Sequence, residues 1–223
     1  SYVLSSLGNT WFILGDFGQA AEKHLEALVI RRNVADRQGE AASLDTLGLV
    51  AQFQSDADHA HQQYEEALAM QRSQNDQRSQ AYTLTHIALL TEETGDLDAA
   101  ASAQRKALAL RTRGSSLISA AIDNLAGLAR IALARSDMSE ARQRVGQIAD
   151  LLAEKGMADV EFPALVYLTM YRVLRAAGET ERAEAALVEG QAMIRQQAGQ
   201  IADAAVRQMF LDHGPYIHQL LSV

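Results

Sequence analysis

Apolar residues recur along this chain at intervals of three and four, which is the spacing of one face of an α-helix. The apolar stretches come in pairs, and each pair is joined by a short turn in which an acid follows a small residue. The five copies of this turn are Gly15-Asp16, Ser55-Asp56, Gly95-Asp96, Ser136-Asp137 and Gly178-Glu179. Their spacing of 40, 40, 41 and 42 residues predicts a repeat protein built from helix pairs.

Each turn has the residues that a corner between two helices requires. Glycine or serine tolerates the left-handed backbone that ends the first helix, and the acid can accept a hydrogen bond from a free N–H group of the second. A column of alanines follows the turns, and these are Ala20, Ala60, Ala100, Ala141 and Ala183. Small residues at fixed places let neighbouring helices approach closely, so we expect tightly packed helix pairs.

These repeated residues resemble the tetratricopeptide-repeat (TPR) family. In the first repeat the resemblance is carried by Leu7-Gly8, Trp11, Leu14-Gly15-Asp16, Ala20 and Ala27-Leu28. The third repeat keeps it at Ile87-Ala88, Gly95-Asp96, Ala100 and Ala107-Leu108. The period exceeds the usual repeat of about 34 residues and is similar to the long repeats of kinesin light chains and of large bacterial regulatory ATPases. A HEAT or armadillo array shares the period but lacks the small residue at the turn and the alanine columns.

The resemblance implies an all-α fold, an α-α superhelix (TPR solenoid) of five helix pairs followed by C-terminal capping helices. We expect the repeats at about 1–35, 36–76, 77–114, 115–156 and 157–202. Serines in Gly114-Ser115-Ser116 are expected to cap the fourth repeat, and Pro163 falls in the first turn of the fifth, where proline is tolerated. Residues 203–223 leave the pattern, and we expect them to start at a capping Asp203 and to cover the open end of the stack. They resemble the closing segment of TPR domains in bacterial signal-transduction ATPases, nucleotide cyclases and transcriptional activators.

Composition narrows the possible partners. The net charge is −8, and the basic residues are scattered among acids, which argues against nucleic-acid binding because phosphate contacts need a concentrated positive footprint. There is no cysteine, and no apolar run approaches the ~20 residues of a membrane span. We therefore expect a cytoplasmic protein. The apolar start at Tyr2, Val3, Leu4 and Leu7 is unlike the polar outer face of a terminal repeat, so we expect further repeats or another domain upstream.

The sequence offers little support for catalysis, a metal or a cofactor. His59 and His61 are two residues apart and point to different faces of a helix, whereas helical metal ligands need a spacing of three or four. The carboxylate pairs Glu65-Glu66 and Glu92-Glu93 also diverge around their helices, which is typical of a solvated face. We expect a non-enzyme without cofactor or metal.

If the chain follows the family, the first helix of each repeat lines a concave wall that binds a partner. The expected partner-binding residues are Asn9, Phe12, Asp45, Gln52, Phe53, Tyr82, Thr85, Glu92, Arg130, Arg172 and Arg175. Aromatic area with charged groups that fix register suits an extended peptide or a partner helix. The leading hypothesis is a protein- or peptide-binding regulatory module of a larger bacterial signalling or transcription-regulatory protein. The alternative is a small-ligand or signalling-peptide sensor similar to quorum receptors.

Overall fold

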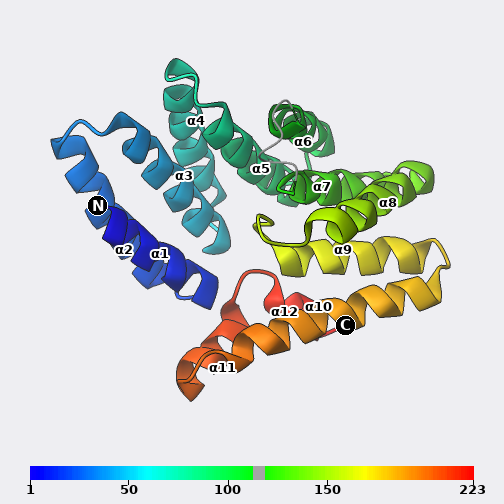
Figure 1. Cartoon of the computed structure of the whole chain (residues 1–223). Helices are drawn as coiled ribbons and strands as arrows, with labels where there is room; N and C mark the ends of the chain where they lie inside the picture. The colour runs from blue at the N-terminus through cyan, green and yellow to red at the C-terminus, as the bar shows by residue number, and fades with distance from the viewer. Residues whose placement is uncertain (113–118) are drawn as a thin grey trace.

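The computed structural model describes residues 1–112 and 119–223, which form twelve α-helices and no β-strand (Figure 1). The predicted caps at Ser115 and Ser116 lie outside the described residues. The helices are α1 (Tyr2–Leu14), α2 (Phe17–Asn33), α3 (Arg37–Phe53), α4 (Ala57–Ser73), α5 (Gln77–Glu93), α6 (Leu97–Thr112), α7 (Ala121–Ala134), α8 (Met138–Lys155), α9 (Pro163–Ala176), α10 (Thr180–Gly199), α11 (Ala204–His213) and α12 (Ile217–Leu221). Consecutive helices pack in pairs, and each pair packs on the next. The predicted all-α superhelix is confirmed.

The corner chemistry holds for four turns and fails at the fifth. The small residue of every turn has a left-handed backbone, with φ of 87° at Gly15, 64° at Ser55, 89° at Gly95, 59° at Ser136 and 78° at Gly178. The acid that follows caps the next helix in the first four turns, as where Asp16 accepts a hydrogen bond from the Gln19 N–H at 2.9 Å. Glu179 makes no such bond, so that prediction is wrong. Its longer side chain pairs instead with Arg142, whose Nε lies 2.7 Å away.

The alanine column forms the centre of the stack. All five predicted alanines have no exposed surface, because each lies where the second helix of a pair approaches its neighbours most closely. A Cβ at Gly48 would lie 2.7 Å from the ring of Tyr64, which shows how little room the first helix leaves. The repeated small residues therefore set the distance between helices, as predicted.

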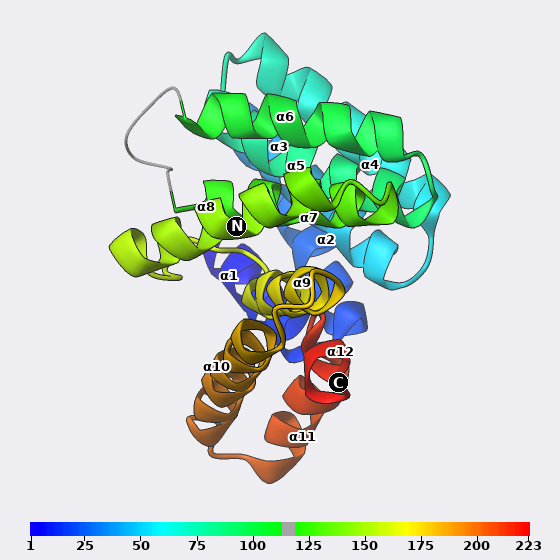
Figure 2. The ribbon, with the colours of Figure 1, turned by 90° about the vertical axis from the view of Figure 1, so that its right-hand side faces the viewer.

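The C-terminal segment connects the two ends of the superhelix. Asp203 accepts hydrogen bonds from the N–H groups of Ala205 and Val206 at 2.8 and 3.0 Å, and so begins α11 as predicted. Helix α12 packs on α9 and α10, whereas α11 packs on α10 and also on α1. In Figure 1 α11 lies beside α10 on the side of α1, and in Figure 2 α11 and α12 lie next to α10 below α9. The segment packs on the last pair and also reaches the first helix, so it closes the superhelix into a ring.

The contact between α1 and α11 is a close approach of two backbones. A Cβ on Gly15 would lie 2.4 Å from the carbonyl carbon of His213, and one on Gly214 would lie 3.1 Å from the carbonyl oxygen of Ile13. The φ of 87° at Gly15 also belongs to a region that residues with a Cβ rarely adopt. Glycine at this corner therefore serves both the turn and the closure of the ring.

Candidate functional site

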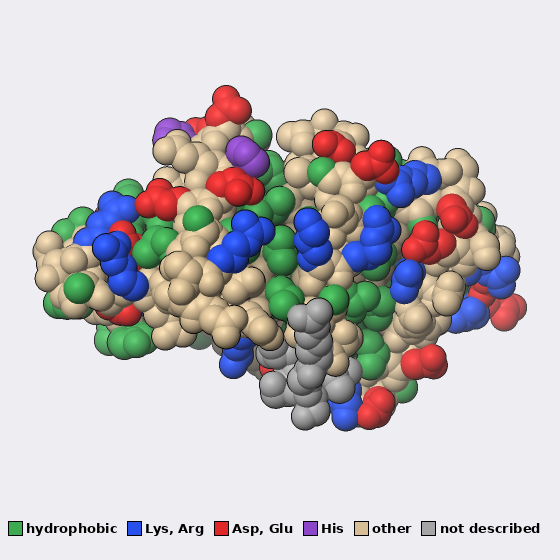
Figure 3. Space-filling view, turned by 90° about the horizontal axis from the view of Figure 1, so that it is seen from above, with side chains coloured by type: hydrophobic (Ala, Val, Ile, Leu, Met, Phe, Trp, Pro, Cys, Tyr) green, Lys and Arg blue, Asp and Glu red, His purple; other side chains and the backbone are tan. Residues whose placement is uncertain are grey.

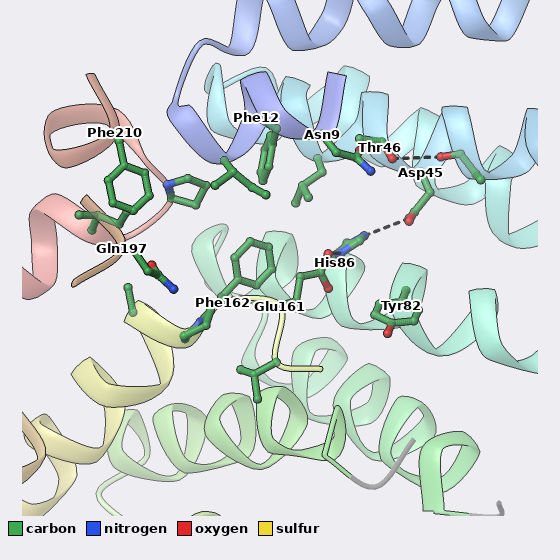
Figure 4. A pocket seen from close by; sticks show the side chains of 18 of the residues that line it. Asn9, Phe12, Asp45, Thr46, Tyr82, His86, Glu161, Phe162, Gln197 and Phe210 are labelled. Carbon is green, nitrogen blue, oxygen red and sulfur yellow. Dashed lines mark hydrogen bonds and ion pairs between the residues drawn. The ribbon is translucent and has the colours of Figure 1, made fainter. Parts of the chain in front are cut away.

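A cavity of about 580 Å³ lies inside the ring. One wall comes from α1, α3 and α5, the first helices of the first three pairs, and the opposite wall comes from residues 160–164 together with α10, α11 and α12. Figure 4 shows the two walls facing each other, with Phe210, Gln197 and Phe162 toward one end and Asp45, His86 and Tyr82 toward the other. The cavity therefore has an apolar end beside the C-terminal helices and a polar end on α3 and α5.

Aromatic rings hold the two walls together next to the cavity. The ring of Phe53 lies 5.2 Å from those of Phe12 and Phe17, 5.3 Å from that of Tyr216 and 6.3 Å from that of Phe162. These residues come from the first two pairs, from the linker before α9 and from the turn before α12. Edge-to-face and offset ring pairs at such distances are each worth about 0.5–1.5 kcal/mol beyond their buried area, so the cluster stabilises ring closure.

A buried histidine between two carboxylates forms the polar end. The Nδ1 of His86 lies 3.0 Å from Oδ1 of Asp45, and its Nε2 lies 2.9 Å from Oε1 of Glu161 (Figure 4). His86 is only 2% exposed. Both ring nitrogens must donate to satisfy both carboxylates, and only the protonated imidazolium has two donors.

The electrostatics of this triad favour a charged histidine. Burial by itself lowers the pKa of His86, but the charges and hydrogen bonds of Asp45 and Glu161 together raise it well above its ordinary value. Burial raises the pKa of Glu161, because it disfavours the charged carboxylate. The imidazolium of His86 outweighs this effect and holds the pKa of Glu161 below its usual range. The triad therefore carries one net negative charge near neutral pH.

Asp123 of α7 fixes the linker that brings Glu161 into the cavity wall. Its carboxylate accepts hydrogen bonds from the backbone N–H groups of Glu161 at 3.0 Å and Phe162 at 3.2 Å. Burial raises the pKa of Asp123 to about 6, against the lowering by the Arg111 guanidinium 3.8 Å away. The carboxylate is therefore ionised at neutral pH and keeps both backbone groups bonded. Arg111 in turn lies over the ring of Tyr82, 4.7 Å from its centroid.

Two buried oxygen atoms of the lining residues have no hydrogen-bond donor among the described residues. They are Oε2 of Glu161 and Oε1 of Gln71. Gln71 is 1% exposed and uses its amide nitrogen to bond Thr83 at 2.8 Å. A buried acceptor without a donor costs about 1–3 kcal/mol, so a donor brought beside either oxygen would be stabilising.

Four of the residues expected to bind a partner line the cavity. These are Asn9, Phe12, Asp45 and Tyr82, each from the first helix of one of the first three pairs. The remaining seven lie elsewhere. Phe53 belongs to the aromatic cluster, and Arg172 and Arg175 are exposed near the end of α9, outside the described cavity lining.

The other four expected residues, Gln52, Thr85, Glu92 and Arg130, make polar contacts with residues of other helices. Gln52 accepts a hydrogen bond from the Tyr64 hydroxyl and donates to Glu93, both at 2.9 Å. Arg130 makes an ion pair with Glu92, with Nε 2.7 Å from Oε1. Thr85 accepts a hydrogen bond from Asn124 at 2.9 Å. Their polar groups join neighbouring first helices and are not lining residues of the central cavity.

Sequence reasoning missed His86, Glu161 and Phe162. His86 follows an expected inward position by one residue, and a buried histidine gave no separate signal. Glu161 and Phe162 lie in the linker between α8 and α9, where the repeat interval has lengthened to 42 residues. That longer interval, with Pro163 behind it, was the available sign that extra chain is inserted here.

Across residues 1–112 and 119–223, no three His, Asp or Glu residues are arranged to hold a metal ion. In the same residues, no helix is both long enough and apolar enough to cross a membrane.

Comparison with known proteins gives a family match and structural relatives. The family model described as tetratricopeptide repeat matches residues 2–73, and no curated protein matches the sequence. The crystal structure of BtubC (BKLC) from P. vanneervenii has a TM-score of 0.66 at 17% identity, covering 90% of this chain and 82% of that one. Nearly identical TPR-like repeats of a Podosopora anserina chain described as a kinesin light chain give 0.60 at 17% identity, with 91% and 97% covered. The crystal structure of MamA protein gives 0.51 at 14% identity, with 91% and 97% covered.

Proposed function

We propose that the chain is a non-catalytic module of the tetratricopeptide-repeat type, whose family model matches residues 2–73, and that it binds a short segment of a partner protein or peptide in its central cavity. The observation that carries the proposal is the cavity of about 580 Å³ with a wall made by the first helices of three successive pairs. Its volume is in the range of about 300–1,000 Å³ that ligand pockets occupy. An apolar end beside a polar end gives both contact area and orientation to a bound segment.

Filling the cavity tests this proposal. Ala42 is exposed on α3 and lines the cavity, so Ala42→Trp places a large ring there without disturbing the packed core. We expect peptides selected from a random displayed library on the wild-type protein to bind this variant about tenfold or more weakly, since each lost 1.4 kcal/mol is a factor of about ten. Fluorescence titration measures the affinities. Ala109→Trp, at an exposed position of α6 outside the cavity, is the matched control and should bind normally; peptides that bind both variants equally would contradict the proposal.

A second candidate is a sensor for a small ligand or signalling peptide. It is favoured by the closure of the cavity by α11 and α12, because an enclosed pocket suits a compact ligand better than a continuous strand or helix. A ligand that binds only the folded protein raises the melting temperature with its concentration. A thermal-shift screen of metabolites and short peptides, repeated on Ala42→Trp, separates this candidate from a protein-only module.

We also propose that the module is the regulatory part of a larger bacterial signalling or transcription-regulatory protein. This proposal is supported by exposed apolar side chains on α1 and α2 and directly after α2. Among them, Tyr2, Val3, Val29 and Val34 are between 58% and 81% exposed. Large apolar side chains that stay exposed in this way are available to pack against another part of a longer chain. Hydrogen exchange on a version extended upstream should show new protection in α1 and α2, and unchanged exchange there would count against it. Cytoplasmic location stays a prediction.

The distribution of charged residues argues against direct nucleic-acid binding. The face seen in Figure 3 carries Lys and Arg side chains interspersed with Asp and Glu, and the chain has 20 basic against 28 acidic residues. Phosphate backbones are bound by concentrated positive charge. The charge distribution therefore favours a protein or peptide partner.

A further inference from the structure

We propose that the cavity binds an ammonium group carried on an apolar body, with the Glu161 carboxylate accepting its hydrogen bonds. This inference rests on the proposed binding function and names the chemistry of the bound segment. The ammonium belongs to a lysine side chain or a free amino terminus of a peptide, or to a free alkylamine.

Two acceptor oxygens of the lining residues favour a ligand that donates hydrogen bonds. Oε2 of Glu161 and Oε1 of Gln71 are both buried acceptors without a described donor, and both residues line the cavity. Oε1 of Glu161 is already engaged by His86 at 2.9 Å. An ammonium has three donors and no acceptor, so one bound beside Glu161 can donate to Oε2 and leaves no group of its own that needs a donor.

The charge of the lining residues also selects a cation. The described lining contains the carboxylates of Asp45 and Glu161, the imidazole of His86, and no Lys or Arg. With His86 protonated, Asp45 and Glu161 keep one net negative charge, and the nearby Arg111 guanidinium is itself paired with Asp123 at 3.8 Å. An anionic ligand would bring a further negative charge beside these carboxylates, which is unfavourable unless the charge is paired.

The apolar end of the cavity favours an apolar body on the ligand. Phe162, Ile194, Phe210 and Ile217 line it, and Figure 4 shows Phe162 and Phe210 toward the end away from Tyr82. Contact with these side chains removes apolar surface from water at both sides. A ligand with a cationic head and an aliphatic or aromatic body therefore matches both ends at once.

Peptides selected on the wild-type protein, and lost on Ala42→Trp, supply the test. We expect replacement of their lysine by norleucine, or acetylation of their amino terminus where the ammonium is terminal, to weaken binding about tenfold or more, because a hydrogen bond to a charged group is worth about 1.5–3 kcal/mol. Replacement of the lysine by glutamate should abolish binding. Cavity-bound peptides whose uncharged forms bind within about twofold of the originals would overturn the inference and leave the proposed function standing.

A carboxylate variant assigns the effect to the proposed acceptor. Glu161→Gln keeps the side-chain shape and removes the charge, so we expect the difference between lysine and norleucine peptides to shrink from about tenfold to about twofold. Glu181→Gln, at an exposed position of α10, is the matched control and should keep the full difference. Circular dichroism checks that each variant is folded, and the wild-type comparison of peptides decides the inference if Glu161→Gln does not fold.

If no peptide is selected, the inference can be tested with simple alkylamines. Hexylamine should then raise the melting temperature of the wild-type protein more than hexanol does, and Ala42→Trp should remove the difference. That result supports the inference with a small amine as the source, while the peptide-binding function fails. Equal effects of hexylamine and hexanol together with no selected peptide would overturn both.

Discussion

Replacing Gly15 by alanine is expected to release α11 from α1 and to open the ring. The new Cβ would lie 2.4 Å from the carbonyl carbon and 2.6 Å from the carbonyl oxygen of His213, and backbone atoms cannot swing aside as a flexible side chain can. The left-handed backbone at this corner adds about 1–2 kcal/mol of strain. Together with a clash of about 1–3 kcal/mol, we expect a loss of roughly 2–5 kcal/mol, measured by urea unfolding.

Gly95 offers a matched control for the backbone strain. Its φ of 89° is close to the 87° of Gly15, and a Cβ there would meet no other atom within 4 Å. Gly95→Ala should therefore show the strain alone, with normal hydrogen exchange in α11 and α12. Gly15→Ala should accelerate exchange in both helices and weaken binding in the cavity that they enclose. Equal stability losses and equal exchange in the two variants would show that the close approach to His213 does not hold the ring closed.

The features that could be predicted from the sequence are those that repeat. Each turn and each alanine acts through contacts within one pair or with the next pair, so the same side chain recurs at the same place. The fifth turn shows the limit of this reasoning, because Glu179 occupies a capping position and pairs with Arg142 instead. Local chemistry permits either arrangement, and the neighbouring repeat decides between them.

The cavity could be predicted only in part, because half of its wall is not periodic. Asn9, Phe12, Asp45 and Tyr82 follow from the inward positions of the family pattern. The bond between His86 and Glu161 joins residues 75 apart in the chain, and no repeat relates them. Inward polar residues of adjacent repeats also come close enough to pair, as Arg130 does with Glu92, so an inward position alone does not identify a residue that is free to contact a partner.

Replacing His86 by glutamine is expected to destabilise the protein by about 2–4 kcal/mol at neutral pH. The variant leaves the carboxylates of Asp45 and Glu161 facing each other without the imidazolium between them. Removing one partner from a fully buried ionic group costs about 3–5 kcal/mol. We expect a loss about 1 kcal/mol below that range because the side chains of Asp45 and Glu161 are 13% and 25% exposed. Urea unfolding at constant pH gives the value.

The same variant should remove a pH dependence of stability above pH 6.5. The groups that face His86 are Asp45 from α3, Tyr64 from α4 and Glu161 from the linker. The two carboxylates raise the folded pKa of His86 well above the ordinary 6.5, so its stabilisation is complete below pH 6.5 and is lost as the pH rises through the raised pKa. In that window the folded protein holds one proton more than the unfolded chain, so the free energy of unfolding should fall by up to about 1.4 kcal/mol per pH unit.

A second histidine variant separates this effect from a general loss of stability. Burial lowers the pKa of His24 to about 4, so well above the ordinary 6.5 this residue is neutral in both the folded and the unfolded protein, and its contribution to stability there does not change with pH. His24→Gln should therefore keep the wild-type slope between pH 7 and the raised pKa of His86, whereas His86→Gln should lose it. A wild-type slope that survives in His86→Gln would mean that the imidazole between Asp45 and Glu161 is not the group that holds the extra proton, and the charge assigned to the polar end of the cavity would have to be revised.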